Sequence, residues 1–91
     1  MSEREKIQKL INDGCRQEAV RMLTAFVQLH PEREEDLLWL GELIYAEGNM
    51  TEALNKFNAV LRLNPDNQKA RNYATMIHGI LGYYCKDLLN P

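Results

Sequence analysis

Residues 36–65 read DLLWLGELIYAEGNMTEALNKFNAVLRLNP, and this stretch decides the fold. Apolar and small residues recur every three or four positions on both sides of a turn at Gly48, a spacing typical of amphipathic helices. These residues are Leu37, Leu40, Gly41 and Ile44 before the turn, and Ala53, Leu54, Phe57, Val60 and Leu61 after it. The stretch therefore predicts two packed helices, in which Gly41 and Ala53 allow close approach and Phe57 fills the space beside them.

The pattern repeats at an interval of 34 residues. A shift of this length toward the N-terminus places Gly48 on Gly14, Glu52 on Glu18, Ala53 on Ala19, Phe57 on Leu23 and Pro65 on Pro31. A fixed period with like residues in like positions is typical of arrays in which helix pairs stack side by side. Proline cannot continue a helix, so the two prolines mark the boundaries between repeats.

These residues resemble the tetratricopeptide repeat (TPR) family, whose pattern is Trp-x2-Leu-Gly-x2-Tyr, a turn glycine, Ala-x3-Phe-x2-Ala and a final proline. The chain matches this pattern at Leu40, Gly41, Gly48, Ala53, Phe57 and Pro65. It departs at three positions that remain apolar, with Leu37 for the Trp, Ile44 for the Tyr and Val60 for the second Ala.

The resemblance implies an all-α fold of five helices, in which antiparallel helix-turn-helix repeats stack as a short right-handed solenoid. The whole chain, 1–91, would be a single TPR domain. Its first repeat would cover about 1–32 and its second about 33–66, and about 67–91 would form a capping helix with a tail.

The composition is ordinary for a small soluble domain, with 45% hydrophobic and 26% charged residues. The net charge is −2 and Lys and Arg do not cluster, so we expect no nucleic acid as a partner. No apolar run approaches the ~20 residues of a membrane-spanning helix, and the first residues do not form a secretory signal. We therefore expect no membrane association and a cytoplasmic location, with Cys15 and Cys85 as reduced thiols.

Motifs of enzymatic or metal chemistry are missing from the sequence. It has no glycine-rich phosphate loop, HExxH, GxSxG or CxxC, and its acidic residues do not converge with a histidine. We therefore expect no enzyme: no catalytic residue, no metal site and no cofactor.

The last predicted helix, from about 66 to 81, is apolar on one side only. The apolar side holds Ala70, Ala74, Ile77 and Leu81, and the side that would face a second helix holds Arg71, Thr75 and His78. A helix of this kind suits the end of a stacked array, where its outer side meets water. A solvated position also explains His78 better than a metal-binding role does.

The helix starts carry capping and charge signals. Ser2 is followed by Glu5 three positions later, and Asn49 by Glu52, so both are expected caps. The start of the third helix is crowded by Glu32, Glu34, Glu35 and Asp36. Acidic residues there suit the helix dipole, an interpretation that we favour over an acidic binding patch.

Stacked helix pairs curve, and the first helices of successive repeats line the inner side. The predicted groove residues are Arg4, Gln8 and Ile11 from the first helix, Glu35, Leu38, Trp39, Glu42 and Tyr45 from the third, and Lys69, Asn72, Tyr73 and Met76 from the fifth. Trp39, Tyr45 and Tyr73 are aromatic where solubility alone would favour charge, and aromatic residues often anchor bound peptides. Local packing, for example of Trp39 on Tyr73, is an equally open interpretation.

By resemblance, TPR modules bind short peptides or other proteins along this groove. One subclass grips a C-terminal carboxylate with Lys and Asn at set inward positions, and only scattered basic residues match it here. We therefore expect a non-enzymatic adaptor whose groove, apolar with both charge signs, binds an extended or helical segment of a partner protein.

The residues after Gly82 offer an alternative. The apolar ones are Tyr83, Tyr84, Leu88 and Leu89, too many for an idle tail and too few for another helix pair. We expect them to extend or fold back along the last helix and cover the end of the stack. The alternative is a weak homodimer through this end, which would make the chain a structural, self-associating scaffold.

Overall fold

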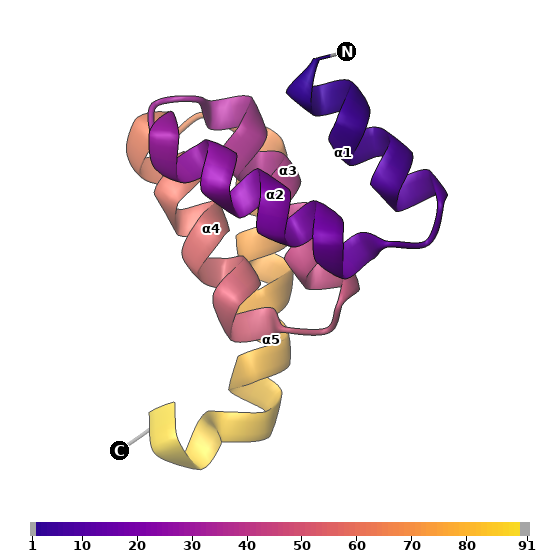
Figure 1. Cartoon of the computed structure of the whole chain (residues 1–91). Helices are drawn as coiled ribbons and strands as arrows, with labels where there is room; N and C mark the ends of the chain where they lie inside the picture. The colour runs from indigo at the N-terminus through magenta and orange to yellow at the C-terminus, as the bar shows by residue number, and fades with distance from the viewer. Residues whose placement is uncertain (1, 90–91) are drawn as a thin grey trace.

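The computed structural model describes the backbone of residues 2–89 and the side chains of residues 2–82. Within these residues there are five α-helices and no strand (Figure 1). The helices are α1 (Glu3–Asn12), α2 (Arg16–Leu29), α3 (Glu34–Ala46), α4 (Met50–Leu63) and α5 (Gln68–Leu89). The predicted all-α fold of five helices is therefore confirmed. None of the helices in the described part of the chain is long and apolar enough to pass through a membrane.

Local signals of the sequence set the ends of the helices. Ser2 and Asn49 cap α1 and α4, because each side-chain oxygen accepts a hydrogen bond of 3.2 Å from the backbone amide three residues later. Gly14 and Gly48 follow α1 and α3 with φ of 83° and 87°, the left-handed conformation that favours glycine. The chain can therefore reverse direction tightly between the two members of each helix pair.

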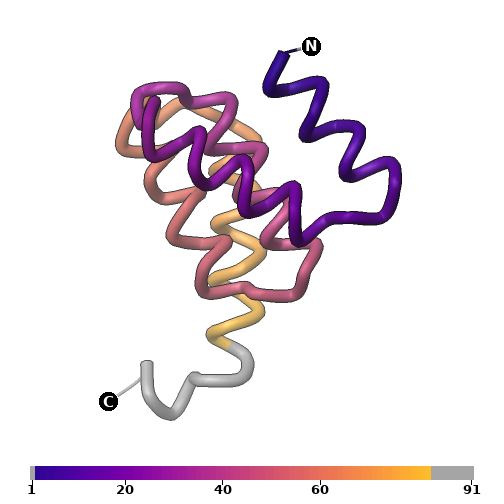
Figure 2. The backbone as a smooth tube through the Cα atoms, in the orientation of Figure 1, coloured from indigo at the N-terminus to yellow at the C-terminus, as the bar shows by residue number. Residues whose placement is uncertain are grey.

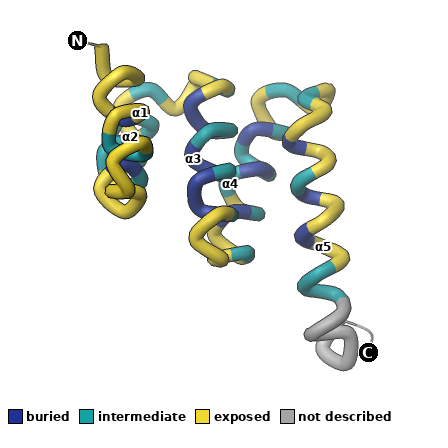
Figure 3. The backbone as a smooth tube through the Cα atoms, turned by 90° about the vertical axis from the view of Figure 1, so that its right-hand side faces the viewer, coloured by how far each residue is buried: buried dark blue, intermediate teal, exposed yellow. Residues whose placement is uncertain are grey.

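Each helix packs against the next one along the chain, from α1 on α2 to α4 on α5. The backbone trace runs to and fro through the successive helices (Figure 2). Seen from the side, α1 and α2 form one layer, α3 and α4 a second, and α5 a third (Figure 3). Buried residues are most frequent in the middle layer, because α3 and α4 have neighbours on both sides (Figure 3).

The closest approach in the core joins α3 and α4 at Gly41. A Cβ atom at this position would lie 2.8 Å from Cε1 of Phe57, whose side chain is completely buried. The Phe57 ring therefore fills the space that a larger residue at position 41 would need. Ala53, the residue expected opposite Gly41, is also fully buried, but the atoms nearest to Gly41 belong to Phe57.

The orientation of α5 agrees with its sequence pattern, whereas its length differs from the expected one. Its buried residues include Ala70, Ala74 and Ile77, and its exposed residues include Arg71, Thr75 and His78. The helix begins at Gln68 and continues to Leu89, beyond the expected end near 81. The prediction that Tyr83, Tyr84, Leu88 and Leu89 cover the end of the stack or join two copies falls outside the residues whose side chains are described.

Candidate binding cleft

A cleft of about 450 Å³ is lined by residues of α1, α3 and α5. Its wall consists of Arg4, Glu5, Gln8, Glu35, Leu38, Trp39, Glu42 and Lys69, which we call the cleft residues. Seven of them belong to the twelve predicted groove residues, so the structure brings the central part of that groove together. Glu5 was missed, although it lies 34 residues before Trp39 and the repeat period could have found it.

Two of the predicted groove residues, Tyr45 and Tyr73, pack among the helices. Tyr73 stacks on Phe57, with ring centroids 4.5 Å apart and 5° between the ring planes. Tyr45 meets Tyr73 edge to face, with centroids 5.2 Å apart. The two tyrosines therefore join α3, α4 and α5 and lie outside the wall of the cleft.

The other three predicted groove residues also lie outside the wall. Ile11 is partly buried against the core. Asn72 is exposed, and its side-chain oxygen accepts a hydrogen bond of 2.9 Å from Gln68. Met76 is 47% exposed on α5. The cleft is therefore shorter than the groove that the sequence predicts.

Trp39 forms the aromatic part of the wall and is partly buried. The guanidinium carbon of Arg4 lies 5.1 Å from the centroid of the Trp39 ring, within range of a cation–π interaction. Among the described residues, the aromatic neighbours of Tyr73 are Phe57 and Tyr45. Trp39 thus packs partly against the core and contacts a cation from α1, whereas the suggested pairing with Tyr73 is not found among the described residues.

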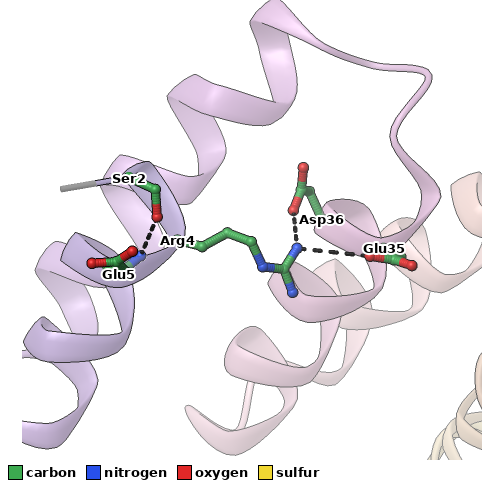
Figure 4. A network of polar contacts seen from close by, with 5 residues as sticks. All are labelled: Ser2, Arg4, Glu5, Glu35 and Asp36. Atoms are coloured by element: carbon green, nitrogen blue, oxygen red, sulfur yellow. Dashed lines mark hydrogen bonds and ion pairs between the residues drawn. The ribbon is translucent and has the colours of Figure 1, made fainter.

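Arg4 also connects α1 to the start of α3. Its Nη1 donates a hydrogen bond of 2.8 Å to Oδ1 of Asp36, and it lies 3.9 Å from Oε2 of Glu35 (Figure 4). Asp36 is only 3% exposed, so its carboxylate depends on Arg4 for a compensating charge. We expected Asp36 to serve the dipole of α3. This interpretation is incomplete, because Asp36 also forms an ion pair with a residue of another helix.

Glu34 fixes the same end of α3 to the loop before α5. Its carboxylate accepts hydrogen bonds from the side-chain amides of Asn67 and Asn64. These bonds, first that of Asn67, lower the pKa of Glu34 and favour its ionised form. Asn67 also accepts a hydrogen bond of 3.0 Å from the amide of Ala70, so it caps α5 while it holds α3.

Glu42 connects α3 to α5 on the opposite side of the cleft. Its Oε2 accepts a hydrogen bond of 3.3 Å from the hydroxyl of Tyr73 and lies 3.8 Å from Nζ of Lys69. Burial of Tyr73, and then the charge of Glu42, raise the pKa of the phenol. The phenol therefore stays protonated and continues to donate this hydrogen bond.

A second hollow of about 360 Å³ adjoins the cleft at the start of α3. Its wall consists of Arg4, Arg33, Glu34, Glu35 and Asp36, so the two hollows share Arg4 and Glu35. Arg33 lies over the ring of Phe26, with its guanidinium carbon 5.3 Å from the centroid. We call these two hollows, which share Arg4 and Glu35, the channel; its apolar residues are Leu38 and Trp39.

Within residues 2–82, no group of three His, Cys, Asp or Glu side chains is placed to hold a metal ion. The expectation that the chain is not an enzyme stays a prediction. No protein-family model, curated protein or solved structure matches the chain.

Proposed function

We propose that the chain is a non-enzymatic binding module of the TPR kind, in which helix pairs stack as a short right-handed solenoid. The cleft would hold an extended or helical segment of a partner protein. The observation that carries the proposal is that one cleft collects residues from α1, α3 and α5. These are the first helices of the two predicted repeats and the capping helix, whose inner sides form the binding groove in the family that the sequence resembles.

The place of Trp39 supports this proposal. Its side chain lies in the wall of the cleft beside Leu38, and both are only partly buried. Trp39 packs partly against the core, but the atoms at the closest crossing of α3 and α4, beside Gly41, belong to Phe57. A large aromatic side chain that remains accessible in a cleft can contribute about 2 kcal/mol or more to the binding of a partner.

A peptide selection tests the proposal without knowledge of the partner. A displayed library of random twelve-residue peptides is selected on the wild-type protein, and the most enriched peptide is synthesised and labelled for fluorescence anisotropy. We expect Trp39→Ala to raise the Kd of this peptide at least tenfold, a loss of about 1.4 kcal/mol. The melting temperature should remain close to that of the wild type.

Leu29→Ala is the matched control, because Leu29 is an apolar residue of α2 that is 76% exposed and does not line the cleft. This variant should bind the peptide as the wild type does. The proposal is wrong if no peptide is enriched, or if the enriched peptide binds Trp39→Ala as tightly as the wild type. A dimer detected by light scattering in a protein that enriches no peptide would favour the self-associating scaffold.

A further inference from the structure

The charges along the channel are unbalanced. Its two walls contain five carboxylates, those of Glu5, Glu34, Glu35, Asp36 and Glu42. They contain three cationic side chains, those of Arg4, Arg33 and Lys69. The surplus of two carboxylates gives the channel a negative potential, which attracts cationic groups and repels anionic ones.

Both cations of the cleft lie beside carboxylates of the protein. Arg4 donates its hydrogen bond of 2.8 Å to the buried Asp36, and Lys69 lies 3.8 Å from Glu42. Arg4 has further N–H groups and Lys69 is 70% exposed, so both can still contact a ligand, but their charges are offset in part by Asp36 and Glu42. The cleft therefore has little uncompensated positive charge to offer an acidic ligand.

Two carboxylates of the cleft remain accessible. The side chain of Glu35 is 88% exposed, and its distance of 3.9 Å from Arg4 is too long for a direct hydrogen bond. Glu5 is exposed on α1, and its side chain forms no ion pair within the described residues. The two lie on either side of Arg4 in Figure 4, one from each helix. Both side chains line the cleft, so a cation that enters it finds an accessible carboxylate on α1 and another on α3.

We infer that the occupant of the cleft is a positively charged segment of a partner protein, with Lys or Arg side chains that meet Glu5 and Glu35. An apolar side chain of the same segment covers Leu38 and the accessible part of Trp39. This inference rests on the proposed function and specifies the chemistry of the partner. It also explains why an aromatic and an aliphatic residue of α3 line the same cleft as the two carboxylates, because the stem of a Lys or Arg is itself apolar.

The peptide selection described above supplies the probe. We expect the enriched pool to contain more Lys and Arg than the unselected library. The most enriched peptide should lose affinity when its Lys and Arg residues are replaced by Gln, and its Kd should rise with salt, because charge attraction is screened. The double variant Glu5→Gln/Glu35→Gln should raise the Kd about tenfold, since it removes both accessible carboxylates and preserves side-chain size.

The matched control is Glu18→Gln/Glu47→Gln, which removes two exposed carboxylates that lie outside the channel. It should change the Kd less than twofold. The comparison separates the effect of the two cleft carboxylates from the effect of a changed net charge. The inference is overturned if the enriched peptides need Trp39 but are neutral or acidic, or if the two double variants bind alike. In both of these outcomes the proposed function stands. If no enriched peptide depends on Trp39 for binding, both the inference and the proposed function are overturned.

Discussion

At Gly41, the absence of a side chain sets the distance between α3 and α4. The ring of Phe57 lies where a Cβ would be, with Cε1 at 2.8 Å and Cζ at 3.0 Å from that position. Phe57 is fully buried, so its ring has no free space into which it could move. Gly79 offers a contrast, because nothing lies within 4 Å of a Cβ built at that helical position.

We therefore expect Gly41→Ala to lower the free energy of unfolding by about 1–3 kcal/mol through overpacking against Phe57. Gly79→Ala should raise it by about 0.5–1 kcal/mol, because alanine loses less backbone entropy in a helix than glycine does. Urea unfolding followed by circular dichroism measures both changes. Equal stability of the two variants would contradict the contact between Gly41 and Phe57.

At the scale of the helices, α1 has the smallest apolar contribution. Ile7 is its only buried residue, although Leu10 and Ile11 also pack partly against the core. Its contact with α3 is polar, through Arg4 and the buried Asp36. The ion pair thus adds to the packing of Ile7 on the core in holding α1, and with it one wall of the cleft, in place.

Removal of one partner of this ion pair should lower the free energy of unfolding more than removal of both partners does. Arg4→Met leaves the Asp36 carboxylate buried without a cation, and we expect it to lower the unfolding free energy by about 1–3 kcal/mol, less than for a fully buried pair because Arg4 is half exposed. The double variant Arg4→Met/Asp36→Leu should recover most of this loss, since it replaces the pair by apolar contacts. Chemical unfolding measures both, with Arg71→Met, at an exposed position of α5, as the control. If Arg4→Met is as stable as Arg71→Met, the ion pair does not hold α1.

At the scale of the whole molecule, the end of the stack is covered by α5. The helix packs its small and apolar residues on α4, makes aromatic and polar contacts with α3, and leaves its outer side in water, as suits a helix at the end of an array. Ile77 is completely buried, and the next residue, His78, is exposed. Two adjacent positions therefore report on the inner and the outer side of α5.

We expect Ile77→Lys to unfold or severely destabilise the domain, because an unpaired buried charge costs several kcal/mol, comparable to the stability of a small protein. His78→Lys should leave the melting temperature within a few degrees of the wild type. Thermal unfolding followed by circular dichroism compares the two. Similar melting temperatures for both variants would show that the orientation of α5 is wrong.

Most residues of the cleft could be predicted from the sequence, but not which of the predicted groove residues would instead pack between the helices. The 34-residue period placed Leu38, Trp39 and Lys69 on the inner side of the helices, and all three line the cleft. The same reasoning placed Tyr73 in the groove, where the structure stacks it on Phe57. Periodicity gives the side of a helix on which a residue lies. How deeply the residue is buried depends on the distance to the neighbouring helix, and the periodicity does not contain that distance.

The sequence by itself determined the five helices, their turns and the two sides of α5, because helical periodicity and capping involve residues within about four positions of each other. Only the tertiary structure decided that Arg4 meets Asp36 and Trp39, and that Glu34 holds Asn64 and Asn67. Arg4 and Asp36 are 32 residues apart, and no local pattern relates them. They meet because packing of α1 on α2 and of α2 on α3 brings a long, flexible cationic side chain within reach of a buried carboxylate.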